Sequence, residues 1–399
     1  MAGQVGSITE RGSTVPVGPG PGSIFELIRK GGAGTRGEIL EATGLARMTV
    51  AQRVDALLAA GLIREGGSDR SPRGRRPRRL EFNVEHSVVA SAAVDTTHTR
   101  TALTTLDGTI LADVDTDVDV TAGPEKVLPA ITSAVQDLLE RTGTSAARLS
   151  GIGICVPGPI EPRTSRPSQP PIMPGWDAYP IVEHVQEIVD VPVLVENDAN
   201  AMAIGEYASA YQDSRSICVI KVSTGIGVGI VVDGRVYQGI DGGAGDIGHV
   251  RLSGYPDALC QCGARGCLAA VASGRAVATS LAAAGIDAHS GRDVGALLAR
   301  GDVEAVNLTR EAGRVIGEVM ASLVCLLNPG VLLMGGALAS SPLISGVRET
   351  LYPNSPPRAT RSLDIGLASL GEDAEIVGMT RTVVDHVFSA EAVDALLTD

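Results

Sequence analysis

The chain has 399 residues, of which 44% are hydrophobic and only 3% aromatic, and its formal net charge is −13. This length gives room for two to three domains, with cores built from Ala, Val, Ile and Leu. The six cysteines form no disulfide framework, and neither an apolar leader nor a membrane-length apolar run is present, which excludes a secreted disulfide scaffold and a membrane protein. We therefore expect a cytoplasmic protein.

The charges are divided unevenly along the chain. Residues 1–80 hold 13 Lys and Arg against 7 Asp and Glu, whereas the remainder holds 20 against 39. A basic segment followed by an acidic one suggests that only the first segment meets a polyanion. Because a run of charges is more often just a solvated face, this interpretation needs support from the pattern of elements.

The N-terminal segment predicts a disordered tail and three helices. Residues 1–21 are rich in Gly, Pro, Ser and Thr, which is typical of disorder. Apolar residues at helical spacing predict a first helix that stops at Gly31-Gly32, a second that begins with the capping-box pattern Thr35–Glu38, and a third over residues 47–60. Three short helices with a Gly-containing turn before the third describe a helix-turn-helix, although a generic three-helix bundle fits the same periodicity.

Two short apolar segments, residues 62–65 and 80–82, follow and can pair as strands around an arginine-rich loop. The arginines of this loop are Arg70, Arg73, Arg75, Arg76, Arg78 and Arg79. Arginines on such a wing suit phosphates and the narrow minor groove. We therefore expect residues 22–83 to form a winged helix-turn-helix DNA-binding domain, with a protein-docking module as the alternative. The expected DNA contacts are Arg47, Thr49, Gln52 and Arg53 of the third helix and Arg75, Arg76 and Arg78 of the wing.

From Val88 on, strands alternate with helices, which predicts an α/β body. The predicted strands lie within residues 88–95, 101–108, 151–158, 191–198 and 328–336, and residues 216–234 predict a glycine-punctuated hairpin. One strand ends in Asp95, another runs into Asn197 and Asp198 directly before a helix, and the last closes in Gly335-Gly336. Polar residues and glycines at strand ends are candidates for a ligand site.

One imidazole and three thiols lie within 19 residues, at His249, Cys260, Cys262 and Cys267. One neutral imidazole and three thiolates are the ligands of a closed tetrahedral zinc site, and four protein ligands leave no position for a water molecule, so we expect structural zinc. The alternative is three buried cysteines and an unrelated histidine. It requires half of the six cysteines to fall within eight residues by accident.

The zinc segment, the sequence Glu-Asn-Asp-Ala-Asn at 196–200 and the sequence Gly-Asp-Ile-Gly-His that ends at 249 together resemble the ROK family of sugar kinases and sugar-responsive repressors. The resemblance covers residues 22–385. It implies an α/β, actin/hexokinase-like, two-lobed body with an N-terminal all-α winged helix-turn-helix. The lobes are expected at residues 84–205 and 206–399, with the last helix returning to the N-lobe. A winged head on this body is the arrangement of the family's regulators, which its free-standing kinases lack.

The resemblance also implies roles for single residues of the body. Asp198 matches the catalytic base of the kinases, which takes the proton from a sugar hydroxyl as the hydroxyl attacks the γ-phosphate. The implied sugar-binding residues are Gly175, Asn197, Asp198, Asp246 and His249, and the implied phosphate-loop residues are Thr224, Gly225, Gly227 and Gly229. Two simpler interpretations stay open, since Asn197 or Asp198 can cap the following helix and the glycines can serve a plain hairpin.

The chain departs from the kinase pattern in three places. Thr97 and His98 stand where the first phosphate loop of the kinases has two glycines, and larger residues there crowd a triphosphate. Asp246 is one methylene shorter than the family's glutamate. Ala269 replaces a second sugar-binding glutamate, which removes two strong acceptors from the pocket.

We therefore expect a DNA-binding transcriptional regulator, a repressor of carbohydrate genes, which is not an enzyme. A sugar or sugar derivative in the body is expected to shift the population that binds DNA. A homodimer or homotetramer is expected, because two-fold operators require paired heads. The alternatives are an ATP-dependent sugar kinase with an accessory head, and a constitutive DNA-binding protein whose sugar pocket has decayed.

Overall fold

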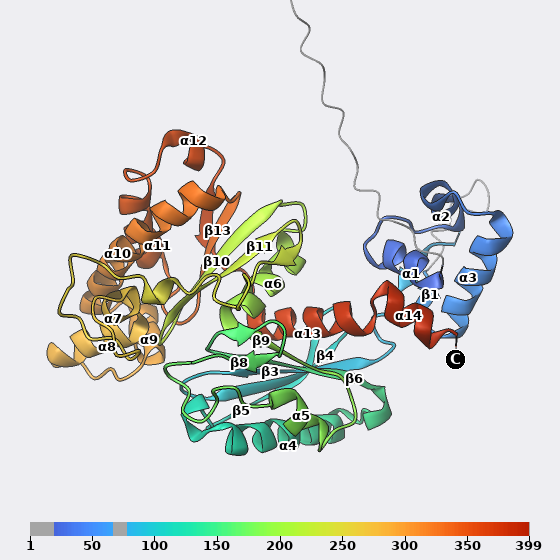
Figure 1. Ribbon diagram of the computed structural model, residues 1–399, viewed down its shortest axis with the longest axis horizontal. Helices are drawn as coiled ribbons and strands as arrows, with labels where there is room; N and C mark the ends of the chain where they lie inside the picture. The colour runs from blue at the N-terminus through green and yellow to red at the C-terminus, as the bar shows by residue number, and fades with distance from the viewer. Residues whose placement is uncertain (1–19, 67–77, 399) are drawn as a thin grey trace, which may run out of the picture. The chain divides into compact units, whose positions relative to one another are not determined.

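The structure of the protein, a computed structural model, describes residues 20–66 and 78–398 (Figure 1). The chain divides into two compact units. The first, which we call the head, consists of the residues up to His86 together with those from His386 on. The second, the body, is Ser87–Asp385. The chain therefore leaves the head once and returns to it at its C-terminal end.

Three helices and a two-stranded antiparallel sheet form the N-terminal part of the head. They are α1 (Pro21–Arg29), α2 (Arg36–Thr43), α3 (Arg47–Ala59), β1 (Ile63–Glu65) and β2 (Leu80–Phe82). The predicted order of helices and strands is confirmed. Thr35 caps α2, since its hydroxyl accepts a hydrogen bond from the backbone N–H of Glu38 (3.2 Å), whereas Ala46 gives α3 no side-chain cap.

A further helix of the head, α14 (Ala390–Leu396), comes from the C-terminal end of the chain. The ring centroid of Phe388 lies 6.3 Å from that of Phe25 and 6.4 Å from that of Phe82. Asp394 accepts a hydrogen bond from the backbone N–H of Gly22 (2.6 Å). From the sequence, the last helix was expected to pack on the N-lobe of the body. In the structure, α14 packs on the head instead. An apolar stripe shows that a helix is buried but not against which partner.

The N-lobe of the body is built on a five-stranded sheet in the order β5-β4-β3-β6-β9. Its strands are β3 (Val88–Val94), β4 (Thr99–Thr105), β5 (Ile110–Thr116), β6 (Leu149–Val156) and β9 (Val193–Asn197). Helices α4 (Pro124–Thr142) and α5 (Ile181–Gln186) cover one face of this sheet (Figure 1). A short hairpin, β7 (Ile160–Glu161) and β8 (Arg166–Pro167), lies in the loop that follows β6.

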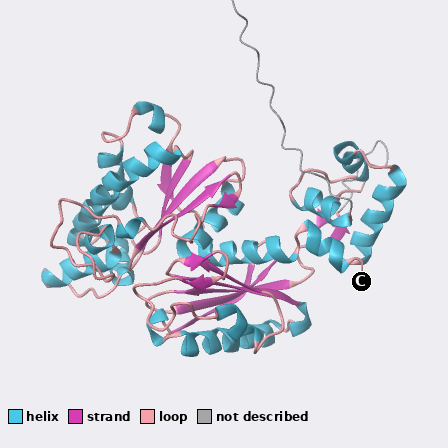
Figure 2. Cartoon of the chain, in the orientation of Figure 1, coloured by secondary structure: helices cyan, strands magenta, loops and turns pink. Residues whose placement is uncertain are grey.

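The C-lobe contains a second five-stranded sheet, in the order β12-β11-β10-β13-β14. Figure 2 shows the strands of both lobes in magenta. Its strands are β10 (Ser216–Val222), β11 (Ile226–Val232), β12 (Arg235–Val236), β13 (Val331–Gly335) and β14 (Asp364–Leu367). In each lobe, three antiparallel strands are followed by two parallel ones. The helices of this lobe are α7 (Leu268–Ala272), α8 (Gly274–Ala283), α9 (Gly291–Ala299), α10 (Val303–Leu327), α11 (Ser341–Leu351) and α12 (Pro357–Thr360).

Two helices, α6 (Asp198–Ala210) and α13 (Ala374–Val387), connect the lobes. Residues of α6 pack on β10 and β11, while Met379 of α13 packs with residues of β3, β4 and β6. The two helices approach closely through glycines, since a Cβ atom on Gly205 would lie 2.2 Å from the carbonyl oxygen of Ala374, and one on Gly378 would lie 1.8 Å from that of Ala201. This approach brings the first residues of both helices close together at the centre of the body.

Each lobe has its own apolar core. The N-lobe core contains the fully buried Trp176, whose indole N–H donates a hydrogen bond to the carbonyl oxygen of Val120 (2.8 Å). The C-lobe core lies between its sheet and helices α7 to α11. None of the helices in residues 20–66 and 78–398 has both the length and the apolar character that a membrane span needs.

Candidate functional site

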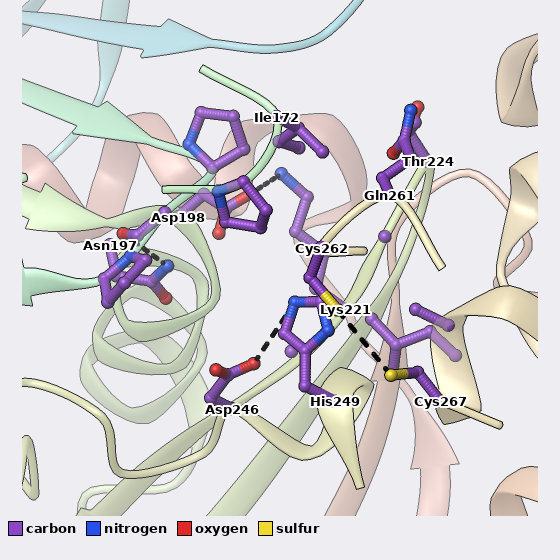
Figure 3. Close-up of a pocket in the computed structure, with 18 of the residues that line it drawn as sticks. Ile172, Asn197, Asp198, Lys221, Thr224, Asp246, His249, Gln261, Cys262 and Cys267 are labelled. Atoms are coloured by element: carbon purple, nitrogen blue, oxygen red, sulfur yellow. Dashed lines mark hydrogen bonds and ion pairs between the residues drawn. The ribbon is translucent and has the colours of Figure 1, made fainter. Parts of the chain in front are cut away.

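The four predicted zinc ligands come together at one place in the C-lobe. The ligand atoms of His249, Cys260, Cys262 and Cys267 all lie within 4.8 Å of one another. Nδ1 of His249 is 3.7 Å from Sγ of Cys260, and the Sγ atoms of Cys262 and Cys267 are 3.7 Å apart (Figure 3). Around a tetrahedral zinc ion with Zn–S bonds of about 2.3 Å, neighbouring sulfur atoms are about 3.8 Å apart. The four residues therefore fit a single tetrahedral metal ion.

Two glycine turns and a helix start shape this cluster. Gly263 and Gly266 have φ angles of 84° and 79°, in the left-handed region that glycine adopts freely. Across the first turn, the backbone N–H of Cys260 donates to the carbonyl oxygen of Ala264 (2.8 Å). Helix α7 begins directly after Cys267. The chain reverses twice within a few residues, which brings the three thiols to one side.

A cavity of about 590 Å³ lies beside the cluster, and both lobes line it. We call it the histidine cavity. It contains four of the five predicted sugar-binding residues, namely Asn197, Asp198, Asp246 and His249. Nε2 of His249 lies 4.0 Å from Oδ1 of Asp246, so the imidazole turns one nitrogen to the thiols and the other to Asp246 (Figure 3). Ala269 also lines the cavity.

The fifth predicted sugar-binding residue, Gly175, is not among the residues that line the cavity. It is exposed, and the next residue, Trp176, is anchored in the N-lobe core. The same loop reaches the histidine cavity earlier, through Gln169, Pro171 and Ile172. The sequence resemblance identified the right loop, but the buried tryptophan holds its end away from the cavity.

Asn197 and Asp198 lie where β9 meets α6. The side-chain oxygen of Asn197 accepts hydrogen bonds from the backbone N–H groups of Ala199 (3.0 Å) and Asn200 (3.2 Å), so Asn197 is the N-cap. Asp198 is only 8% exposed, and its Oδ1 also accepts from the N–H of Ala199 (2.7 Å). The capping interpretation is therefore correct for Asn197 and leaves Oδ2 of Asp198 for another partner.

That partner is Lys221, which the sequence analysis did not single out. Its Nζ lies 2.7 Å from Oδ2 of Asp198, 2.6 Å from Oε1 of Glu375 and 3.9 Å from Oδ2 of Asp95. These four residues come from β10, α6, α13 and the end of β3, so the ion cluster joins both lobes. One signal was available in the sequence: Lys221 is the single charged residue in the apolar run from Ile217 to Val222.

Burial and the neighbouring charges shift the pKa of each of these groups in opposite directions. Burial alone would lower the pKa of Lys221, but the carboxylates of Asp198, Glu375 and Asp95 outweigh it and hold that pKa well above its ordinary value. Burial raises the pKa of Glu375 to about 7, although Lys221 acts in the opposite direction. The pKa of Asp95 is lowered, because Lys221 and hydrogen bonds from Thr96 outweigh its burial. The ammonium is therefore charged, and Glu375 is the member that titrates near neutral pH.

The loop that follows β3 differs in conformation from a glycine-rich phosphate loop. None of residues 95–98 has a positive φ angle, and the backbone N–H of Asp95 donates to the carbonyl oxygen of His98 (2.9 Å). Arg100, which follows this loop, forms ion pairs with Asp113 (3.0 Å) and Asp373 (2.7 Å). The side chains at this end of the sheet are thus occupied by contacts within the body.

A second cavity, of about 540 Å³, lies on the other side of Lys221. Its lining includes Gly291, Gly335 and Gly336, and we call it the glycine cavity. The residues that line both cavities are Asp95, Lys221, Ser223 and Thr224. Of the predicted phosphate-loop residues, Gly225 and Gly227 line only the histidine cavity. A Cβ atom on Gly229 would lie 2.1 Å from the carbonyl oxygen of Ala199 in α6. The last glycine therefore serves helix packing.

In the head, α3 presents a mixed surface. Arg47, Met48 and Gln52 are exposed, with Met48 at 71%, whereas Thr49 and Arg53 are half-buried. At the base of the wing, Arg78 donates a hydrogen bond to Glu65 of β1. The predicted wing contacts Arg75 and Arg76 lie outside the described residues, as do Arg70 and Arg73.

Three comparisons with known proteins bear on this arrangement. The model of the ROK family matches residues 91–385. A xylose repressor of Bacillus spizizenii is 30% identical over 366 residues, which cover 91% of this chain and 94% of that protein. The crystal structure of a ROK family transcriptional regulator, a homologue of the E. coli MLC protein, matches with a TM-score of 0.79 and 25% identity over 95% of this chain and 98% of that one. A ROK family glucokinase from Streptomyces griseus, in complex with glucose and AMPPNP, matches with a TM-score of 0.64 and 27% identity over 74% of this chain and 99% of that one.

Proposed function

The chain belongs to the ROK family, and from that premise we propose that it is a DNA-binding transcriptional repressor whose body binds a sugar as its effector. The observation that carries the proposal is the pairing of a winged head with a cavity-bearing ROK body in one chain. The repressor and regulator relatives cover more than nine-tenths of this chain, whereas the glucokinase covers about three-quarters. The extent of the match thus favours the regulators.

The head is proposed to bind an operator through two kinds of contact. Arg47, Thr49, Gln52 and Arg53 of α3 are assigned to the major groove, where side chains read base edges. Arg75, Arg76 and Arg78 of the wing are assigned to phosphates and the minor groove. The exposed Met48 adds an apolar surface that suits a thymine methyl group. Two-fold operators require paired heads, so the active form is proposed to be a homodimer or homotetramer.

The metal site is proposed to hold one structural zinc ion through His249, Cys260, Cys262 and Cys267. Zinc supplies folding energy to the segment it closes and performs no chemistry here, because all four positions are taken by the protein. His249 links this site to the effector, since its Nε2 faces the histidine cavity beside Asp246. The side chains proposed to hold the sugar are Asn197, Asp198, Asp246 and His249.

A sugar kinase is the second candidate function. Asp198 at the histidine cavity and the glycines after β10 favour it. Against it stand the ion pair of Asp198 with Lys221, the engagement of Arg100 by two carboxylates and the ordinary backbone of residues 95–98. A general base works best when its proton-accepting oxygen can reach the substrate, and here Oδ2 of Asp198 already accepts from an ammonium group.

The test of the proposed function begins with selection of a preferred sequence from random duplexes, followed by fluorescence anisotropy with and without sugars. We expect a selected duplex to bind at least about a thousandfold more tightly than random DNA, and one sugar to weaken that binding by about tenfold or more. Gln52→Ala is expected to lose the preference, whereas Gln136→Ala, an exposed glutamine of α4, keeps it. Failure to select any sequence contradicts a DNA-binding repressor. Steady ATP-dependent phosphorylation of a sugar supports the kinase instead.

A further inference from the structure

Arg275 differs from the other cationic side chains in the interior of the body. It is the second residue of α8, and it is half-buried. Its guanidinium forms no ion pair or hydrogen bond with any residue that the structure describes. The remaining Arg and Lys side chains of Ser87–Asp385 that are not exposed all pair with carboxylates, namely Arg100, Arg166, Lys221, Arg314 and Arg381. A guanidinium is always charged, so partial burial without an acceptor costs free energy.

The backbone holds the start of α8 at the wall between the two cavities. The N–H group of Gly274, which precedes Arg275, donates to the carbonyl oxygen of Ser223 (2.7 Å). A Cβ atom on Gly274 would lie 2.6 Å from the same oxygen, so only glycine allows this approach. Ser223 lines both cavities, whereas Arg275 lines only the histidine cavity. The guanidinium is therefore part of the surface that a ligand in the histidine cavity meets.

The carboxylates that line the histidine cavity have partners other than Arg275. Those of Asp95 and Asp198 lie 3.9 Å and 2.7 Å from Nζ of Lys221. That of Asp246 lies beside the imidazole of the metal cluster, 4.0 Å from its Nε2. The positive charge of Arg275 is thus left for a negatively charged group of a ligand.

We propose that the ligand of the histidine cavity is a sugar with an acidic group, and that Arg275 binds this group. This inference rests on the proposed function, because it assumes a sugar in this cavity. The planar guanidinium can pair with two oxygens of a carboxylate or a phosphate at once, and such charged hydrogen bonds are stronger than those to a neutral hydroxyl. Asn197, Asp246 and His249 remain for the hydroxyls of the same sugar.

The balance of charge favours a carboxylate over a phosphate. Among the described residues that line the cavity, the only other unpaired Arg or Lys is Arg251, which is exposed. A phosphate monoester carries about 1.5 to 2 negative charges at neutral pH. Asp95, Asp198 and Asp246 already place carboxylates around the cavity, and they repel a phosphate more strongly than a singly charged group. We therefore expect a sugar acid to bind more tightly than a sugar phosphate.

The experiment uses three sets of sugars, built on D-glucose, D-galactose and D-mannose. Each set contains the neutral sugar, its uronate, its aldonate and its 6-phosphate. Binding to the full-length protein is measured by titration calorimetry without nucleotide. In the set that binds best, we expect an acidic member to bind at least about tenfold more tightly than the neutral sugar, because a hydrogen bond to a charged group typically contributes that much. The order of the two carboxylates and the phosphate identifies the acidic group.

Arg292 provides a matched control for Arg275. It is the second residue of α9, and each arginine follows a Ser-Gly pair, but Arg292 lines the glycine cavity instead. Arg275→Gln should weaken the binding of the acidic sugar by about tenfold or more and leave that of the neutral sugar unchanged. Arg275→Lys, which keeps the charge but not the planar fork, should lose less, and Arg292→Gln should bind like the wild type. If Arg275→Gln keeps the full preference for the acidic sugar, the role of Arg275 is wrong.

The wild-type protein alone separates this inference from the proposed function. A neutral sugar that binds as tightly as its acidic counterparts overturns the inference while leaving sugar sensing intact. If no sugar of any set binds, the proposed sugar effector fails, and this inference fails with it. Comparison of the sugars on the wild-type protein needs no variant, so a variant that does not fold leaves that test in place.

Discussion

At the scale of single residues, the position of Glu375 in the fold strongly changes the pKa of its carboxyl group. It lies in the first turn of α13, its carboxylate contacts Lys221, and its side chain is 12% exposed. Its pKa is raised to about 7 by burial, against an ordinary value of 4.5. Between these two values the folded protein holds a proton that the unfolded chain has released. Folding therefore takes up a proton in this range, and Glu375 makes the protein less stable as the pH rises toward 7.

We predict that Glu375→Gln removes this dependence. Relative to the variant, the free energy of unfolding of the wild type should fall by up to about 1.4 kcal/mol per pH unit between about pH 4.5 and 7, and the difference should level off above that range. Urea unfolding at several pH values measures it. Glu372→Gln, an exposed glutamate of the preceding turn, serves as the control and should follow the wild type. Parallel curves for the wild type and Glu375→Gln would show that this carboxyl does not titrate in the range.

The zinc ligands and the ion cluster show which site residues can be predicted from a sequence. The four proposed metal ligands lie close together in the chain, and one histidine with three cysteines at this spacing is by itself typical of a zinc site. The contact between Lys221 and Glu375 depends on two distant segments and on the approach of α6 and α13, about which local spacing carries no information. Lys221 itself was visible as a charge in an apolar strand, but its partners were not.

At the scale of elements, the loop from His249 to Cys267 has little regular structure and depends on its ligands. We predict that Cys262→Ser lowers the zinc content to less than about half an ion per chain, while Cys325→Ser, an exposed cysteine of α10, keeps about one. Hydrogen exchange should then show faster exchange in residues 249–267 of the Cys262→Ser variant only, because structural zinc contributes folding energy. Elemental analysis and exchange mass spectrometry provide the two measurements. Equal metal content in both variants would argue against the site.

Helix α14 is predicted to be essential for the head. Phe388 is 3% exposed and packs among aromatic rings, so Phe388→Ala should destabilise the head by about 3–5 kcal/mol. Leu396→Ala, at a 57% exposed position of the same helix, should change little. Limited proteolysis should cut the head of the first variant faster, and operator binding should fall with it. If Phe388→Ala resists proteolysis as well as the wild type does, the contact of Phe388 is not needed for the stability of the head.

Helices and strands were largely predictable, since their apolar spacing and glycine stops are local signals. The three helices of the head and both strands of the wing lie where the pattern indicated. The partner of α14 was not predictable, because several apolar surfaces compete for a short amphipathic helix and only the whole fold decides between them. The same holds for Gly175, whose place follows from the burial of its neighbour Trp176.

At the scale of the whole molecule, the uneven charge predicts how DNA binding responds to salt. The first 80 residues carry the excess of Lys and Arg, while the rest of the chain is acidic. Each phosphate that an arginine neutralises adds about 0.9 to the slope of log affinity against log salt. Contacts to base edges add affinity for one sequence without changing this slope.

We predict that Arg76→Ala lowers the salt slope by about one unit on both selected and random DNA. Gln52→Ala should instead cost about 1–3 kcal/mol on the selected sequence alone, with an unchanged slope. Anisotropy titrations over a series of salt concentrations distinguish the two effects. An equal loss for both variants on both DNAs would contradict this division of labour between α3 and the wing.

The return of the chain to the head also orders events during protein synthesis. Residues 20–86 leave the ribosome before the body does, and Phe388 and Asp394 follow only after the body has been made. At about 5–20 residues per second, the roughly 300 residues of the body take about 15–60 s to synthesise. During that time Phe25 and Phe82 lack the aromatic partner that covers them in the finished head. A chain that ends before α14 therefore has an incomplete head, and under the proposed function we expect it to bind an operator more weakly than the full-length chain does.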